Sequence, residues 1–306
     1  MTDPVTEKVG RSGWLRPVVP QRRPRAAVRH TAMPWLGAVL ALLAISAPSA
    51  VRAGQAGVAQ TPVTQTPAPY EPQSGQEGKD VVWVPTPESL VEAMLDIAKV
   101  TAKDRVIDLG SGDGRTVIAA AKRGASAHGI EYNPDMVKLA QHNAAQAGVT
   151  GRATFEKADL FESDLSKATV ITMFLLPSIN LELRPKLLDL EPGIRLVSNT
   201  FTMEAWEPDD RVTVQEGCTS WCSALLWIVP AKVGGTWQVG NDVLTLTQEF
   251  QMLSGTLGSI AITDGRLRGD EITFKVGAAT YTGRVSGDTM SGMAGSQQWQ
   301  AKRAAP

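Results

Sequence analysis

Cysteine is scarce in this sequence, because only Cys218 and Cys222 occur among 306 residues. Two cysteines are too few for a disulfide framework, and they lack the paired clusters of a zinc site, so no metal is predicted. In an exported chain the two residues would be able to close a tight loop as a disulfide. Two unpaired thiols are the favoured interpretation.

An excess of one charge is also missing, because 30 lysines and arginines stand against 31 aspartates and glutamates. A chain without an overall basic field is not expected to bind nucleic acid. Apolar residues make up 43% of the chain, which is enough to bury a core. The length predicts about two domains.

The N-terminal region has the pattern of an export signal. An arginine-rich segment precedes an apolar run at residues 35–46, which is shorter than the ~20 residues of a membrane-spanning helix. Val51-Arg-Ala53 then resembles a cleavage site before Gly54. Residues 1–53 are therefore interpreted as a signal peptide, with a membrane anchor or a targeting tail as alternatives. Positively charged segments tend to stay on the cytoplasmic side of a membrane, so the part of the chain after Gly54 is predicted to be exported, or membrane-associated on the periplasmic side. A location on the cytoplasmic side of the membrane is the alternative.

Three further parts follow with different patterns. Residues 54–80 are rich in Gln, Thr, Pro and Gly, which predicts a disordered linker. Residues 81–232 alternate apolar runs with helical periodicity, which predicts an α/β, Rossmann-like sheet with helices on both faces and a closing hairpin. Residues 233–306 predict a small antiparallel all-β module, a meander or barrel. Strands of the α/β domain are expected at residues 105–109, 127–131, 154–157, 169–174, 194–198, 211–214 and 224–229.

A glycine turn joins the first strand of this domain to the following helix, in Val106-Ile-Asp-Leu-Gly-Ser-Gly-Asp-Gly-Arg115. Such a turn lets a ligand approach the backbone closely, as in dinucleotide-binding folds. Asp108 and Asp113 would repel a pyrophosphate there, and the spacing is G-x-G-x-G rather than G-x-G-x-x-G. S-adenosyl-L-methionine carries an ammonium and a sulfonium that carboxylates attract, so it is the predicted cofactor. Asp113 is also expected to cap the helix, as Thr86 and Asn133 are expected to cap the helices that begin at Pro87 and Pro134.

Acids at two further strand ends extend the predicted cofactor site. Glu131 ends the second strand, where a carboxylate accepts hydrogen bonds from ribose hydroxyls. Asp159 follows the third strand, where a carboxylate is able to accept the adenine amino group. The predicted cofactor-binding residues are Asp108, Gly110, Ser111, Gly112, Asp113, Glu131, Tyr132, Asp159, Leu160 and Phe174.

Four segments carry a resemblance to a known family: Trp83-Val-Pro-Thr-Pro87, Asp108–Arg115, Gly129-Ile-Glu-Tyr-Asn-Pro134 and Phe174-Leu-Leu-Pro177. They resemble the lysine methyltransferases of the ATP synthase c-subunit and the adenine nucleotide translocase, with their bacterial relatives. The resemblance covers about Val81 to Asp210. It implies a class I methyltransferase fold, S-adenosyl-L-methionine and a protein lysine as acceptor, and it does not extend to the C-terminal module.

The acceptor side of the site is less defined by sequence. Methyl transfer needs the amine, the methyl group and the sulfur in line, and no general base is evident, so the catalytic residues stay unknown. Trp83, Pro85, Thr86 and Phe201 are expected to line the substrate channel. Phe201 and Trp206 are equally compatible with the channel or the core. Asn180, Glu182 and Arg184 are expected on a solvated helix face.

Other functions stay open at this point. They are methylation of a small molecule or RNA, and an exported binding protein that keeps the methyltransferase fold without turnover. An intact set of cofactor residues argues against the last. The oligomeric state and the role of the β-module are not predicted.

Overall fold

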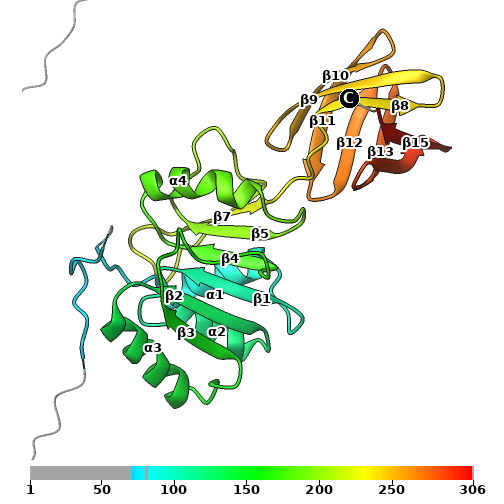
Figure 1. Cartoon of the computed structure of the whole chain (residues 1–306). Helices are drawn as coiled ribbons and strands as arrows, with labels where there is room; N and C mark the ends of the chain where they lie inside the picture. Colours follow the sequence, from blue (N-terminus) through cyan, green and yellow to red (C-terminus); the bar gives the residue numbers. More distant parts are fainter. Residues whose placement is uncertain (1–69, 80–81, 305–306) are drawn as a thin grey trace, which may run out of the picture. The chain divides into compact units, whose positions relative to one another are not determined.

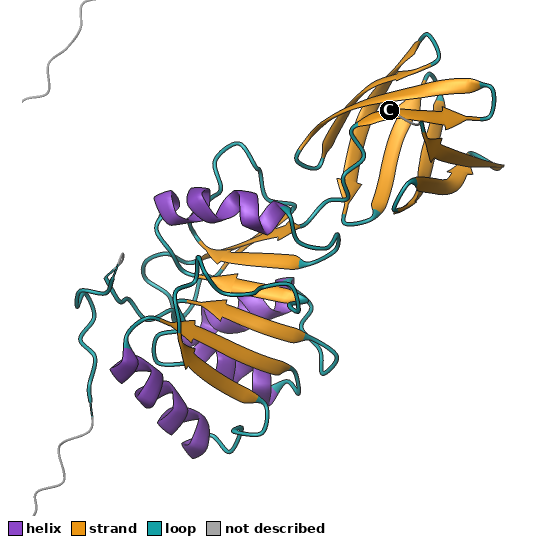
Figure 2. Ribbon diagram, in the orientation of Figure 1, coloured by secondary structure: helices purple, strands orange, loops and turns teal. Residues whose placement is uncertain are grey.

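A computed structural model describes residues 70–79 and 82–304. The predicted signal peptide or anchor and the first part of the predicted linker lie outside these residues. Within the described part of the chain, no helix is long and apolar enough to cross a bilayer. An α/β domain is followed along the chain by a β-barrel (Figures 1 and 2).

A seven-stranded sheet forms the α/β domain, in the order β3-β2-β1-β4-β5-β7-β6. The first five strands of this order run parallel, and β7 is antiparallel to both of its neighbours. This confirms the predicted parallel sheet and closing hairpin. The strands are β1 (Arg105–Leu109), β2 (Ser126–Glu131), β3 (Ala153–Lys157), β4 (Val170–Met173), β5 (Arg195–Asn199), β6 (Asp210–Thr213) and β7 (Ser223–Ile228).

Helices lie on both faces of this sheet, as predicted, but unequally. α1 (Glu88–Ile97), α2 (Arg115–Lys122) and α3 (Pro134–Gln146) pack into one apolar core, and α4 (Pro177–Leu188) packs into the core of the opposite face. Alternate residues of the central strands enter the two cores, because successive side chains of a strand point to opposite faces. The sheet order reverses beside β1, which places a crevice outside the carboxyl ends of its strands.

The predicted helix caps at Asn133 and Thr86 have different outcomes. The Asn133 side chain accepts a hydrogen bond from the backbone N–H of Asp135 (2.9 Å), so it caps α3 as predicted. The prediction for Thr86 is wrong, because Pro87 occupies the N-cap of α1 and no side chain caps it. The Thr86 hydroxyl instead accepts from Asn199 (3.4 Å), and its carbonyl accepts from Arg115 (2.9 Å). Thr86 thus ties the start of α1 to β5 and α2.

The C-terminal module is a closed eight-stranded antiparallel barrel, so of the two predicted forms it is the barrel and not an open meander. Closure comes from the pairing of the first strand with the last, at Trp237 opposite Arg303. Its core includes the buried side chains of Trp237, Phe274 and Trp299. A closed barrel leaves no edge strand exposed. The strands are β8 (Gly235–Val239), β9 (Asp242–Glu249), β10 (Met252–Leu257), β11 (Ile260–Arg268), β12 (Glu271–Val276), β13 (Ala279–Ser286), β14 (Thr289–Ala294) and β15 (Gln297–Arg303).

Candidate cofactor and acceptor site

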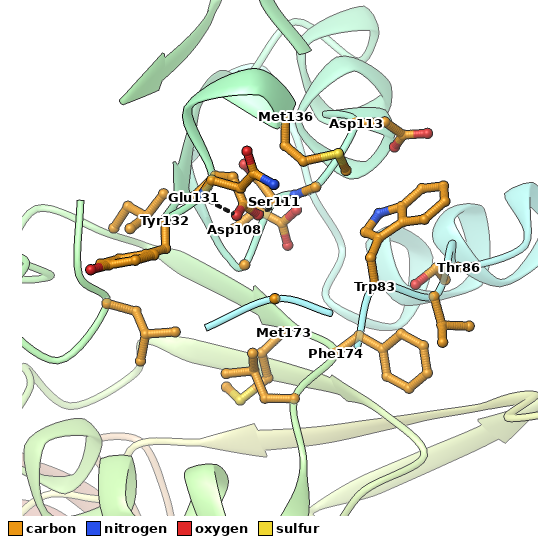
Figure 3. A pocket seen from close by; sticks show the side chains of 18 of the residues that line it. Trp83, Thr86, Asp108, Ser111, Asp113, Glu131, Tyr132, Met136, Met173 and Phe174 are labelled. Atoms are coloured by element: carbon orange, nitrogen blue, oxygen red, sulfur yellow. Dashed lines mark hydrogen bonds between the residues drawn. The ribbon is translucent and has the colours of Figure 1, made fainter. Parts of the chain in front are cut away.

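A cavity of about 590 Å³ lies at the carboxyl ends of β1, β2 and β4. This volume is in the range of small-molecule sites. Apart from Trp206, every residue considered from the sequence for the cofactor site or the substrate channel lines it. They are Trp83, Pro85, Thr86, Asp108, Gly110, Ser111, Gly112, Asp113, Glu131, Tyr132, Asp159, Leu160, Phe174 and Phe201. Figure 3 labels several of them, among them Trp83, Asp108 and Glu131.

The glycine turn brings backbone and side chains close together at the cavity floor. Gly112 has φ +54°, and a Cβ there would lie 2.6 Å from Nε1 of Trp83. Between the glycines, the Ser111 hydroxyl is buried against Gly129 and has no hydrogen-bond partner among the described residues. A Cβ at Gly129 would lie 2.5 Å from the same hydroxyl, which explains the glycine in β2.

Glu131 is oriented by two backbone groups from different segments. Its Oε2 accepts from the N–H of Gly112 (2.9 Å), and its Oε1 accepts from the N–H of Asn133 (2.8 Å). Each carboxylate oxygen has two acceptor sites, so both can also accept from a ligand diol. The glycine turn therefore fixes the acid that the sequence assigned to a ribose.

Asp108 is a buried carboxyl in the middle of the site. Burial raises its pKa to about 7; the hydrogen bond from Thr172 (2.5 Å) opposes this, and the charges of Glu131 and Asp113 add to it. The charged form of a buried acid is costly without a cation. An ammonium group beside Asp108 would supply that cation and restore the ionised form.

Asp113 has a different environment from Asp108. Arg115 donates to its carboxylate from Nη2 (2.6 Å) and Nε (3.0 Å), and the backbone N–H of Arg115 lies 3.3 Å from Oδ1. The N-cap of α2 is nevertheless Gly114, and no side chain caps this helix, so the predicted cap by Asp113 is wrong and its carboxylate is paired with the Arg115 side chain instead. Figure 3 shows its side chain at the rim of the cavity, away from Asp108 and Glu131. Because Arg115 balances its charge, Asp113 contributes less attraction for a cationic cofactor than its place in the motif suggested.

Asp159 is paired with a lysine that the sequence analysis did not single out. Lys79 Nζ lies 2.5 Å from Oδ2 of Asp159 and 5.0 Å from the centre of the Tyr132 ring. Lys79 and the residues before it line the cavity. In this segment Gly75 N–H donates to the carbonyl of Trp83 (2.8 Å), so part of the predicted linker is hydrogen-bonded over the site.

Aromatic rings form the other end of the cavity. Phe174 and Phe201 stack with centroids 5.9 Å apart, and Trp221 lies 6.0 Å from Phe174. Figure 3 shows Phe174 and Trp83 together, on the side of the cavity opposite Tyr132. This end fits the predicted acceptor channel, to which the structure adds Trp221.

At the acceptor end, the structure decides the open assignment of Trp206 and corrects the expectation for Asn180 and Arg184. Trp206 has no exposed surface and packs 6.3 Å from Trp227, so it belongs to the core and not to the channel. Asn180 is fully buried rather than solvated, and its Nδ2 donates to the carbonyl of Phe201 (3.2 Å). Arg184 is half-buried and donates to the carbonyl of Met203 (2.9 Å). These bonds hold the loop that carries Phe201, and no local sequence signal identified them.

The cysteine interpretation also needs correction. Cys218 and Cys222 form a disulfide, with Cα atoms 5.8 Å apart, where unpaired thiols were favoured. The bond closes the tip of the loop between β6 and β7, directly before β7.

The residues present fit S-adenosyl-L-methionine. Glu131 would accept from the ribose hydroxyls and Asp159 from the adenine amino group. Asp108 and the glycine turn would hold the α-ammonium. The Asp108 carboxyl, which lines the cavity and is buried without a neighbouring cation, is the observation that calls for a cationic ligand.

Comparison with known proteins gives the same picture. The family profile described as ANTKMT methyltransferase domain matches residues 108–210. A protein-lysine N-methyltransferase of Saccharolobus islandicus is 48% identical over 140 residues, which are 45% of this chain and 87% of the archaeal protein. The ATP synthase c-subunit lysine N-methyltransferase of Mus musculus is 41% identical over 105 residues, 34% of this chain and 42% of the mouse protein.

A solved structure is similar over the same region. It is named an RNA methyltransferase from Salinibacter ruber in complex with S-adenosyl-L-homocysteine. Sequence identity is 45%, over 49% of this chain and 96% of that chain, with a TM-score of 0.46. The chain spans about half the length of the mammalian relatives it matches, 42% in mouse and 54% in human.

Proposed function

This chain belongs to the methyltransferase family of the archaeal protein-lysine N-methyltransferase, and from this premise we propose that it methylates the ε-amine of a lysine in a protein. S-adenosyl-L-methionine, when bound, supplies an electrophilic methyl group on a sulfonium. The observation that carries the proposal is the division of one cavity into an acidic end at Asp108 and Glu131 and an aromatic end at Phe174 and Phe201.

The chain's residues have separate tasks in this proposal. The glycine turn and Glu131 bind the nucleoside part, and Asp108 holds the α-ammonium. Phe174, Phe201 and Trp83 enclose the acceptor amine and exclude water. Lysine is a nucleophile only without its proton, and its ordinary pKa is about 10.4. Apolar surroundings lower the pKa of an amine, so enclosure by aromatic side chains favours the neutral form without a dedicated base.

Labelling a cell lysate tests the proposal. The full chain is incubated with extract and cofactor carrying a radiolabelled methyl group, and labelled protein is hydrolysed for amino-acid analysis. Labelled methyl-lysine supports the proposal, whereas label in RNA or a small molecule assigns the other acceptor class. The variant Glu131→Ala is the control for background labelling. No label above this control would leave only a binding function.

We also propose that the enzyme works outside the cytoplasm or at the periplasmic face of the membrane. The export-like pattern of residues 1–53 supports this location. The Cys218–Cys222 disulfide supports it as well, since disulfides persist in oxidising compartments. Because the cofactor is made in the cytoplasm, an exported enzyme depends on a supply of it from the cell.

A further inference from the structure

Trp221 is an exposed aromatic residue at the acceptor end of the cavity. It lines the cavity beside Phe174, while 45% of its surface stays accessible. Part of the indole packs against Phe174, and the rest of its surface is available to a ligand at this end of the cavity. Phe174 follows β4, Phe201 follows β5, and Trp221 lies between β6 and β7. Three separate segments thus bring aromatic faces to one opening.

The loop that carries Trp221 is closed by a covalent bond. Trp221 has φ +56°, a left-handed conformation that residues with a Cβ rarely adopt. The disulfide from Cys218 to Cys222 closes the loop around it. In addition to that bond, Ser89 Oγ donates to the carbonyl of Gly217 (3.2 Å) at the base of the loop. The disulfide thus restrains the loop together with the β6–β7 pairing, in which Val214 N–H donates to the carbonyl of Cys222 (2.8 Å).

Aromatic faces suit an amine acceptor better than a carboxylate does. Both attract a lysine ammonium, but a carboxylate in contact raises the pKa of the amine and keeps it protonated. An aromatic face attracts the ammonium on arrival and does not hold its proton by a hydrogen bond. Asp108, Glu131 and Asp159 belong to the cofactor half of the cavity, and Arg115 balances Asp113.

We propose that Trp221 is a specificity-determining residue that contacts the acceptor amine together with Phe174 and Phe201, and that the Cys218–Cys222 disulfide positions it. This inference rests on the proposed lysine acceptor. It makes acceptor binding depend on the redox state of the loop. In a two-electron reduction by a dithiol, the bond becomes two thiols while the dithiol is oxidised to its own disulfide. Trp221 then loses this covalent restraint, whereas the cofactor half keeps its contacts.

Steady-state kinetics on the full chain test this inference, with a pool of single-lysine peptides as acceptor. Trp221→Ala should raise the peptide KM by about tenfold, the loss of one cation–π contact, and change kcat less. Trp221→Phe should restore most of the affinity. The dissociation constant of S-adenosylhomocysteine should change by less than about twofold, because distant sites act independently. Val212→Ala, an exposed position of β6 outside the cavity, is the matched control.

Reduction separates positioning from direct contact. With Trp221 present, treatment with dithiothreitol and the double variant Cys218→Ser/Cys222→Ser should each raise the peptide KM to about the value of Trp221→Ala. Neither should add to Trp221→Ala, since residues that act as a unit are not additive. An unchanged KM in Trp221→Ala, or a further increase on reducing that variant, would overturn the inference.

If no peptide is methylated, that result contradicts the proposed function but does not test the role of Trp221. Binding of an acceptor analogue then tests that role separately. Calorimetry would titrate Nε-trimethyl-lysine into the protein loaded with S-adenosylhomocysteine. Weaker binding to Trp221→Ala than to the wild type and Val212→Ala supports the aromatic contact. Equal binding to all three, or none to the wild type, rejects it.

Discussion

The ammonium of Lys79 lies 2.5 Å from the carboxylate of Asp159, although the two residues are 80 positions apart in the chain. This hydrogen bond, with a further one from the backbone N–H of Phe161, holds the pKa of the Asp159 carboxyl below its usual range. Lys79 also lies over the Tyr132 ring. It therefore competes for the carboxylate that the adenine amino group would use.

Removing this competitor should tighten cofactor binding. Lys79→Met should lower the dissociation constant of S-adenosylhomocysteine by up to about fivefold, because an exposed ion pair contributes at most about 1 kcal/mol. Calorimetry measures the change. Lys138→Met, which removes a surface ion pair with Asp135 outside the cavity, should have no effect. Weaker binding in Lys79→Met would mean that Lys79 helps to hold the ligand.

Cofactor binding should depend on the ionisation of Asp108. The pKa of Asp108 in the ligand-free protein is about 7, so below pH 7 most of this carboxyl is protonated. It must then lose its proton before it can bind the α-ammonium. The affinity for S-adenosylhomocysteine should be constant above about pH 8 and fall by up to about tenfold per unit below pH 7. Asp108→Asn should bind weakly at every pH in this range. If the wild-type affinity does not change between about pH 6 and about pH 8, one unit on either side of the pKa, Asp108 does not bind the α-ammonium.

The same carboxyl should make the ligand-free protein less stable as the pH rises. A folded-state pKa of about 7, against 3.8 in the unfolded chain, means that the unfolded chain ionises first. Stability from this group is present below the unfolded value and is lost between pH 3.8 and about 7. Asp108→Asn should therefore be more stable by about 2–4 kcal/mol at about pH 8, with no gain at about pH 4. Denaturant titration at the two pH values checks the sign.

The acids of the cofactor half should each contribute to binding. Glu131→Ala and Asp108→Ala should weaken S-adenosylhomocysteine binding by about 1–3 kcal/mol, the loss of one hydrogen bond to a charged group. NAD should not bind to the wild type. Calorimetry gives all of these values, with Glu156→Ala, an exposed carboxylate of β3, as the control. If both variants keep wild-type affinity, these acids do not contact the cofactor.

The side of the membrane on which the chain lies can be measured directly. Alkaline phosphatase fused after Lys79 should be active if the chain is exported, because this reporter folds only where disulfides form. The same fusion placed after residue 30, before the apolar run, is the inactive reference. An inactive fusion after Lys79, together with an N-terminus mapped upstream of Gly54, would place the enzyme on the cytoplasmic side.

Local patterns in the sequence were sufficient for the cofactor half of the site. The glycine turn needs positive φ angles within a few residues of Asp108, and Asn133 caps α3 through its own neighbour. Alternation of strand and helix then places the ends of β1 and β2 side by side, because parallel strands share their carboxyl edge. Glu131 could therefore be assigned to the same cavity as Asp108 before any contact was known.

Tertiary structure alone decided the acceptor half and the barrel. The sequence pattern indicates which face of an element is apolar but not which other segment covers it. Trp206 was therefore equally compatible with the channel and the core, and Asn180 was compatible with a solvated face. The disulfide depends on a loop geometry that two cysteines do not specify. Closure of the barrel depends on β8 pairing with β15, at opposite ends of the module. These contacts join segments far apart in the chain, and only the packed fold brings Trp221 to the opening that Phe174 and Phe201 form.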